Sequence, residues 1–333
     1  MSKADLVAAI LWIGVTLYAV FGGADFGGGM WDLLAGQSER GERARRLIDH
    51  SIAPVWEANH VWLIFVLVVL WTAFPTVFSA IMTTLYIPLA LAALGIVLRG
   101  AGFAFRHALP GPVRRPATRV FGISSVLTPF FLGTVVGAVA SGEVPAEGGG
   151  DPTASWTGAL PLLTGVMFVA LAAYIAGVFL VRDADAAGDE DLHRYFLQRS
   201  LVMAVIGGAA AVAGIFALQE HARYVYDGLT SWPGIFLVIG SGICGLVALV
   251  LLVTGRSLNW VMRPAAVGAV VTVIWGYFAA AFPYMLPTDV TISDAAAVSD
   301  ILTVVIVVFG AAAVLVIPSL ILLYVLSQRQ ALE

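Results

Sequence analysis

The chain has 333 residues, of which 60% are hydrophobic and 11% are charged, and its mean hydropathy is +0.95. Soluble domains carry about 25% charged residues, so this composition excludes a water-soluble globule and indicates helices that cross a bilayer. The net charge of −4 argues against a general affinity for nucleic acid. The single cysteine, Cys244, excludes an intrachain disulfide and a zinc–cysteine cluster, and we predict no metal site on this chain.

Nine apolar stretches are long enough to span a membrane, and backbone hydrogen bonding in hydrocarbon requires them to be helical. We therefore predict an all-α polytopic membrane protein, with a single transmembrane domain over residues 1–333. Prolines punctuate several stretches, where they end or kink a helix. The predicted spans are 6–33, 54–74, 77–105, 118–141, 157–181, 200–219, 233–254, 264–286 and 298–326.

The distribution of basic residues predicts the orientation. Fifteen of the 17 Lys and Arg residues lie in the C-terminus or in and beside the loops after the first, third, fifth and seventh spans. Basic loops stay in the cytoplasm, so we expect a multi-pass membrane protein with its N-terminus outside and its C-terminus inside. The longest connections, 141–155 and 183–191, are expected to be solvated.

One carboxylate, Asp25, lies inside the first predicted span. It belongs to a glycine-rich run, residues 22–29, in which each glycine lowers helix stability by about 1 kcal/mol relative to alanine. Such small residues let a neighbouring helix approach closely. Because a charge in a span is costly, Asp25 either stabilises a tight helix pair or carries protons, since burial lets a carboxylate bind and release them near neutral pH.

A second polar group opens the second predicted span. Trp56, Glu57 and His60 are three and four residues apart, so they share one helix face. Glu57 either carries protons or pairs with an arginine at the lipid headgroups. Trp56 and Trp62 can also be interfacial residues, which is the more typical role for Trp62. His60 is the histidine placed inside a span, and one histidine gives little support for a haem held wholly by this chain, because haem iron usually needs two axial ligands.

Arg99 and Arg106 are seven residues apart and fall on one face at the inner end of the third predicted helix. They either extend towards lipid phosphates or balance Asp25 and Glu57. Asp32 lies at the end of the first span, where a solvated carboxylate is expected.

The run Gly23–Gly27, with the sequence GADFG, and the run Ser51–Leu63, with the sequence SIAPVWEANHVWL, resemble subunit II of cytochrome bd-type quinol oxidases. The spans and basic inner loops fit this family along essentially the whole chain. The resemblance implies two four-helix bundles plus one peripheral helix, in the plasma (inner) membrane of a bacterium. The first bundle would cover about 1–141, the second 157–286, and the ninth helix 298–326.

The resemblance also implies a function. This chain would pair with a similarly built subunit I in a complex that oxidises quinol and reduces O₂ to water. The haem b and haem d groups and the quinol-oxidising loop would belong mainly to subunit I, so this chain would not be the catalytic subunit. It can hold a structural quinone, contacts membrane lipid, and helps to bring cytoplasmic protons to the oxygen site; small single-helix subunits can join the complex.

The family's two carboxylates fall on Asp25 and Glu57, and its arginine falls on Arg99. Glu57 and His60 depart from the commoner Asp and Gln, and the family gives His60 no role. We place Asp25, Glu57 and His60 on a proton pathway and Arg99 and Arg106 beside it as electrostatic partners. The motif and packing residues are Gly23, Gly27, Trp56, Asn59 and Trp62.

Two other functions share these features. A proton-coupled secondary transporter acting without a redox partner would also bury carboxylates, but it would have paired broken helices in two corresponding halves. A purely structural assembly factor would differ from an oxidase subunit only in the activity of variants at Asp25 and Glu57.

Overall fold

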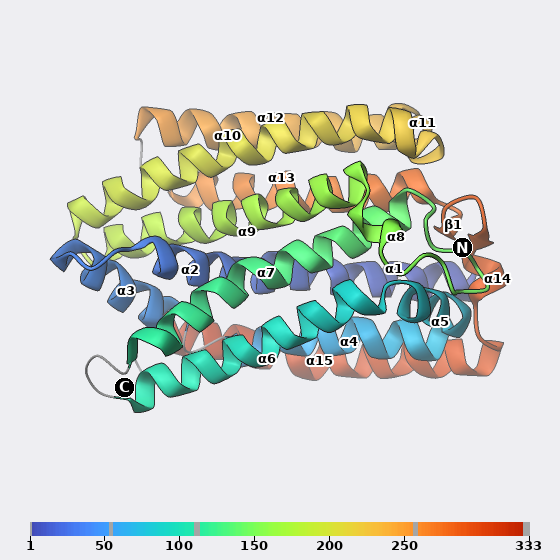
Figure 1. The fold of residues 1–333 in the computed structure, drawn as a ribbon, viewed down its shortest axis with the longest axis horizontal. Coiled ribbons are helices and arrows are strands. Elements are labelled where there is room, and N and C mark those ends of the chain that lie inside the picture. The colour runs from blue at the N-terminus through green and yellow to red at the C-terminus, as the bar shows by residue number, and fades with distance from the viewer. Residues whose placement is uncertain (1, 53–55, 110–113, 256–258, 329–333) are drawn as a thin grey trace.

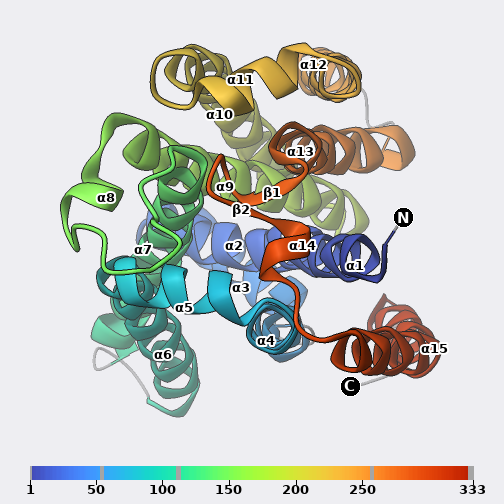
Figure 2. The ribbon, with the colours of Figure 1, turned by 90° about the vertical axis from the view of Figure 1, so that its right-hand side faces the viewer.

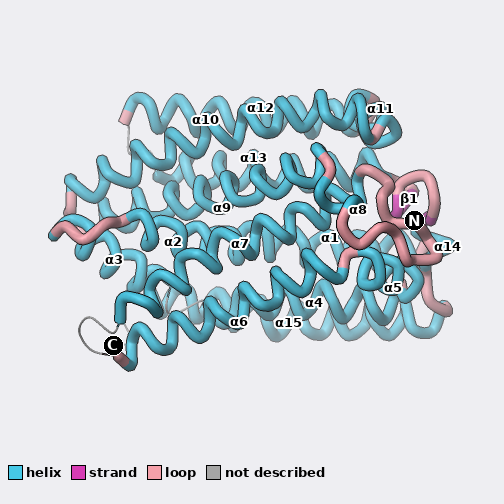
Figure 3. Tube along the Cα trace, in the orientation of Figure 1, coloured by secondary structure: helices cyan, strands magenta, loops and turns pink. Residues whose placement is uncertain are grey.

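Long helices run side by side through the structure, and the loops gather at the two ends of the bundle (Figures 1 and 3). The computed structural model describes residues 2–52, 56–109, 114–255 and 259–328. The N-terminus lies at the end that holds α8, β1 and α14, whereas α3 lies at the opposite end (Figure 1).

The elements follow one another along the chain as a nearly all-helical series with one small hairpin. They are α1 (Lys3–Leu17), η1 (Tyr18–Gly22), α2 (Gly23–Leu34), α3 (Glu39–Ile52), α4 (Trp56–Ala73), α5 (Pro75–Thr84), α6 (Tyr86–Ala108), α7 (Arg114–Ala140), α8 (Ala154–Thr157), α9 (Ala159–Ala186), α10 (Glu190–His221), α11 (Arg223–Thr230), α12 (Gly234–Thr254), α13 (Asn259–Ala281), β1 (Tyr284–Leu286), β2 (Val290–Thr291), α14 (Ile292–Ala295) and α15 (Ser299–Gln328).

Within the described residues, eight helices are long and apolar enough to cross a membrane, and the bent pair α4–α5 raises the number to nine if it counts as one span. The predicted all-α polytopic fold is therefore confirmed. The first span is one continuous stretch, Lys3–Leu34, that contains α1, the π-helical turn η1 and α2.

The chain turns sharply between α4 and α5, where the helix axis bends by 116°. Pro75 opens α5, and Phe74 leaves the helical conformation with φ −136° and ψ 60°. Proline disfavours the α region for the residue before it, which is consistent with the break at this position. The predicted span 77–105 is therefore wrong at its start, because residues 75–84 form α5 and the membrane-crossing helix α6 begins at Tyr86.

A hairpin and a loop close the end of the bundle that holds the N-terminus. The predicted span 264–286 extends too far, because α13 ends at Ala281 and β1 pairs with β2 in an antiparallel ladder. The Asp289 side chain accepts a hydrogen bond of 2.8 Å from the Ala146 backbone amide. The hairpin thus fastens the loop between α7 and α8.

α2 lies in the middle of the molecule, with α7 and α9 packed against it (Figure 2). A Cβ atom added to Gly27 would lie 2.1 Å from the carbonyl oxygen of Ala172 on α9. One added to Gly29 would lie 2.1 Å from Oγ of Ser125 on α7. The glycine-rich run therefore lets both neighbours approach the backbone of α2.

α15 lies at the periphery, next to α1 and α4 (Figure 2). The Lys3 ammonium on α1 donates hydrogen bonds to Ser299 Oγ at 2.9 Å and Thr303 Oγ1 at 2.8 Å. These bonds hold the start of the peripheral helix against the first span.

Candidate functional site

A buried ion pair joins α2 to α6. The Arg99 guanidinium donates to Asp25 Oδ1 at 2.7 Å and to the Asp25 backbone carbonyl at 3.2 Å, and each side chain is 1% exposed. Arg99 Nε also donates to Ser125 Oγ on α7 at 3.0 Å. α7 packs against both α2 and α6, so the arginine reaches Asp25 along the surface of α7. Of the alternatives for Arg99, the structure has the one in which it balances Asp25.

Two aromatic rings enclose the Arg99 guanidinium. Its central carbon lies 5.0 Å from the ring centre of Phe26 and 4.8 Å from that of Phe121. A cation over an aromatic face is stabilised by the ring quadrupole, the more so where water is excluded. These contacts help to hold the positive charge in place beside Asp25.

The π-helical turn η1 lies directly before the glycine-rich run. Such turns change the regular hydrogen-bond ladder of a helix and often occur at functional sites. Asn59 on α4 is buried and its amide donates to the Phe21 carbonyl in this turn at 3.3 Å. The His60 ring lies 5.9 Å from the ring of Phe26 and 6.3 Å from that of Tyr18, measured between centroids. α4 therefore brings His60 to the same region as Asp25.

A second ion pair, which the sequence analysis missed, lies further along the same two helices. Asp32 is 1% exposed and accepts a hydrogen bond from the Arg106 guanidinium. The expectation of a solvated Asp32 was wrong, because the long Arg106 side chain crosses α7 to reach it. The Arg106 carbon lies 4.1 Å from the ring centre of Phe121, which therefore lies against both guanidinium groups.

Helix α3 completes this second group. Arg106 also donates to Asp49, and Arg45 Nε lies 3.1 Å from Asp32 Oδ1. Arg114, at the start of α7, lies 3.8 Å from Asp49. One buried carboxylate, one half-buried carboxylate and three arginines thus meet where α2, α3, α6 and α7 end or begin.

The loop 183–191 is exposed at Ala187, Gly188 and Asp191, as expected, but several of its carboxylates also bind neighbouring helices. α9 continues to Ala186, and Asp183 accepts hydrogen bonds from Ser51 Oγ at 2.8 Å and from Arg263 at 2.7 Å. The Arg43 guanidinium on α3 lies 3.3 Å from Asp189 and 2.5 Å from Asp191. Ion pairs therefore tie α3, α9, α10 and α13 together at this end.

The remaining predicted site residues are placed unevenly. Pro54 and the side chains of Trp56 and Glu57 lie outside the described residues. Trp62 is half-buried and packs edge-on against Phe65, with ring centroids 6.4 Å apart. A Cβ atom added to Gly23 would lie 3.9 Å from Ala172, which is an ordinary van der Waals contact. The described part therefore brings together Asp25, Arg99, His60 and Asn59, with Arg106 at a second pair.

Comparisons with known proteins agree with this architecture. The model of the family described as cytochrome bd terminal oxidase subunit II matches residues 4–327. A bd oxidase structure from Geobacillus thermodenitrificans superposes with a TM-score of 0.83 at 26% identity, covering 97% of this chain and 98% of that chain.

Curated relatives carry similar names. The Bacillus subtilis protein named "Putative cytochrome bd menaquinol oxidase subunit II" is 24% identical over 314 residues, which is 87% of this chain and 86% of the relative. The Escherichia coli (strain K12) cytochrome bd-I ubiquinol oxidase subunit 2 is 36% identical over 101 residues, which is 30% of this chain and 25% of the relative. The family match spans nearly the whole sequence, and this chain belongs to the cytochrome bd terminal oxidase subunit II family.

Proposed function

We propose that this chain is the non-catalytic subunit of a quinol oxidase. It would pair with a haem-bearing subunit I, and the complex would oxidise quinol and pass four electrons to O₂ to form water. In this complex the chain stabilises the assembly and brings protons from the cytoplasm towards the oxygen site. The proposal rests on one observation above all, the Asp25–Arg99 pair, in which an ionisable carboxylate is buried within a membrane-crossing helix.

Proton chemistry explains why an oxidase would need such a carboxylate. Reduction of one O₂ to two waters consumes four protons along with four electrons. If these protons come from the cytoplasm while quinol releases its own outside, the reaction builds a membrane potential. A buried carboxylate can hand on protons without an open pore. We assign this role to Asp25 and Glu57, with His60 beside them and Arg99 as the electrostatic partner.

The residues around His60 do not fit a haem held by this chain. A six-coordinate haem needs two axial ligands, such as His with His or Met. Among the described residues, the rings of Tyr18 and Phe26 pack beside His60, and neither side chain is the His or Met that would complete such a pair. We therefore assign haem b and haem d to the partner subunit. A bound structural quinone and small single-helix subunits remain part of the proposal, to be sought by mass spectrometry of the purified complex.

The proposed orientation puts the N-terminus outside and the C-terminus in the cytoplasm. The arginine-rich group around Arg106 and the ion pairs of α3 would then face the cytoplasm, as basic residues do in bacterial inner membranes. We further propose that the chain divides into a first bundle over about 1–141 and a second over 157–286, with α15 as the peripheral ninth helix.

A secondary transporter is the weaker alternative. It predicts broken helices at corresponding places in two halves. In the described residues the one bent pair of the kind that breaks a span is α4–α5, in the first half of the chain. The asymmetry favours a supporting subunit.

The proposal is tested in the complex purified from native membranes. The complex is expected to contain a second polytopic subunit and to show haem bands in a reduced-minus-oxidised spectrum that disappear without that subunit. Replacing Glu57 by Gln is expected to lower quinol oxidase turnover per haem while the complex still assembles. Unchanged turnover at equal haem content would refute the relay, and a colourless single chain from native membranes would refute the oxidase.

A further inference from the structure

The two buried ion pairs repeat with the same spacing. Asp25 and Asp32 are seven residues apart on α2, and Arg99 and Arg106 are seven apart on α6, so each pair joins residues that are 74 positions apart in the sequence. Seven residues span about 10 Å along a helix and return to nearly the same face. We call these two pairs, together with Asp49, the ion-pair ladder.

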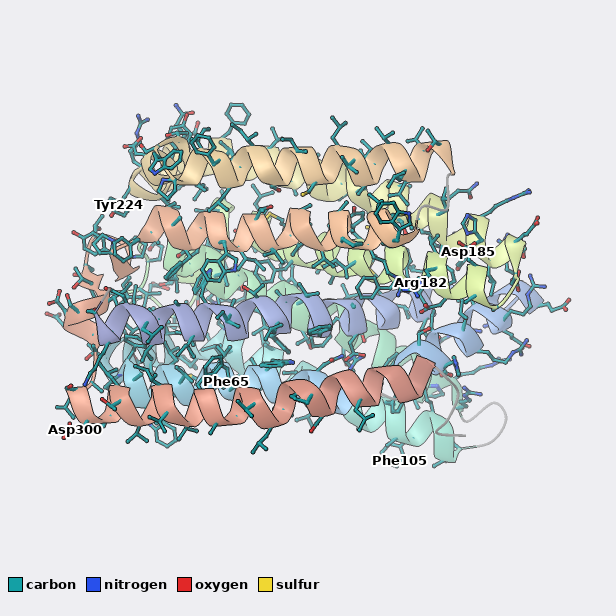
Figure 4. The ribbon with its side chains drawn as sticks, turned by 180° about the vertical axis from the view of Figure 1, so that it is seen from behind. Phe65, Phe105, Arg182, Asp185, Tyr224 and Asp300 are labelled. Atoms are coloured by element: carbon teal, nitrogen blue, oxygen red, sulfur yellow. The ribbon has the colours of Figure 1, made fainter. Side chains whose placement is uncertain are left out.

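The ion-pair ladder is buried at Asp25 and Asp32 and becomes exposed at Asp49. The side chains of Asp25 and Asp32 are 1% and 0% exposed, that of Asp49 is 21% exposed, and that of its neighbour Arg114 is 47% exposed. Phe105, next to Arg106, lies at the same end of the bundle as Arg182 and Asp185, and opposite Asp300 and Tyr224 (Figure 4). The ladder therefore leads from the interior of a span to the arginine-rich end.

Within the described part of the chain, the two pairs leave some of their own buried polar atoms unsatisfied. Asp25 Oδ2, Arg99 Nη1 and Arg106 Nε are buried and have no hydrogen-bond partner among the described residues. Buried polar groups of this kind are usually satisfied by ordered water, which makes about three hydrogen bonds to them. The interval of about 10 Å between the carboxylates is too long for a direct hydrogen bond and suits such bridging water.

We propose that Asp49 and Asp32 form the cytoplasmic end of the proton route to Asp25, with Arg106 as the positioning residue that holds both carboxylates. This inference rests on the proposed function, and it identifies where the protons leave the cytoplasm. Arg106 donates to Asp32 through one terminal nitrogen and to Asp49 through the other, so a single guanidinium fixes the two acids side by side.

The transfer is a sequence of proton exchanges in which no electron moves. Asp49 takes a proton from cytoplasmic water, and its carboxylate becomes a neutral acid. The proton passes to Asp32, which restores the Asp49 carboxylate, and then through bridging water to Asp25. Arg106 stays charged throughout, because guanidinium groups do not release their proton in proteins. Loss of the proton restores the Asp32 carboxylate, and Arg45, 3.1 Å away, stabilises its negative charge.

The experiment uses the assembled complex with Asp32→Asn, which keeps the shape of the side chain and removes its titration. Oxygen uptake with a water-soluble quinol, per haem, is expected to fall on the order of tenfold or more, since positioned proton-transfer groups contribute about 10²–10⁴-fold. The solvent deuterium isotope effect should rise, and proton uptake from the cytoplasmic side of proteoliposomes should slow in parallel. Asp32→Glu should restore most of the rate, because it returns a titratable acid.

The matched control is Asp183→Asn, which removes another arginine-paired carboxylate at the same end of the bundle, 2.7 Å from Arg263. It should leave turnover and isotope effect unchanged. If Asp32→Asn behaves like this control while Glu57→Gln is impaired, the ladder is refuted and the proposed function stands. If Glu57→Gln is also unimpaired, the relay function itself fails. If the Asp32→Asn complex does not assemble, the same measurements are made on Asp49→Asn, whose side chain is half-buried, and unchanged turnover in that variant refutes the ladder.

Discussion

The Asp25–Arg99 pair predicts a strong and asymmetric response to mutation. Arg99→Gln would leave the Asp25 carboxylate buried without a cation, and removal of one partner of a buried pair costs about 3–5 kcal/mol. The variant also loses the charged contacts with the rings of Phe26 and Phe121. The double variant Asp25→Asn with Arg99→Gln holds two neutral amides instead. We expect it to be more stable than Arg99→Gln alone, with a coupling energy of about 0.5–3 kcal/mol.

The assay is thermal unfolding of the purified complex, followed by intrinsic fluorescence at one fixed scan rate because membrane complexes unfold irreversibly. The unfolding midpoints should rank wild type highest, the double variant next and Arg99→Gln lowest. Arg263→Gln serves as control, since Arg263 and Asp183 are 13% and 22% exposed and water screens their interaction. A double variant that loses as much as the two single variants together would refute the reasoning, and so would a control as damaged as Arg99→Gln.

Two further predictions concern the close approach of α2 to α9 and the loop between α7 and α8. Gly27→Ala should sharply lower the yield of folded complex, because the added Cβ would lie 2.1 Å from a backbone oxygen of α9. The control Gly100→Ala should leave the yield unchanged, because open space surrounds Gly100. Equal yields for the two variants would contradict the close approach of α2 and α9. Hydrogen bonds from the backbone amides of Ala154 and Thr153 lower the pKa of Asp151 below its ordinary 3.8. The ionised carboxylate therefore stabilises the local turn above pH 3.8, and this stabilisation is lost as the pH falls through the lowered pKa. Hydrogen exchange at neutral pH should therefore be faster around residues 153–157 in Asp151→Ala than in wild type, and equal rates would show that the carboxylate does not hold the turn.

Hydropathy predicted the spans well because the free energy of transferring a span into hydrocarbon is summed over about 20 residues, so that a few polar positions do not change its sign. The end of a span before Pro75 was predicted, but the second break, between α5 and α6, was missed for the same reason, since the residues of α5 are as apolar as a span. A proline can kink a helix or end it, and the outcome depends on how the flanking segments pack in the folded protein.

The candidate site was predicted in part. Asp25 and Arg99 were picked out because charges inside spans are rare, and the structure pairs them. Asp32 was missed because a carboxylate at a helix end is expected to meet water, and its burial depends on Arg106 arriving from another helix. A signal was nevertheless present in the sequence, namely the equal seven-residue spacing of two acids on one span and two arginines on another.

The equal offset of the two ion pairs also sets a mechanical limit. A slip of α6 along α2 by one turn, about 5.4 Å, would separate both arginines from both acids at once, and no partial slip would keep either pair. The two ion pairs therefore fix the register of α6 against α2. Any motion that keeps both pairs intact must therefore leave α2 and α6 in the same relative position, and an insertion or deletion within either helix would be tolerated only where both pairs can still form.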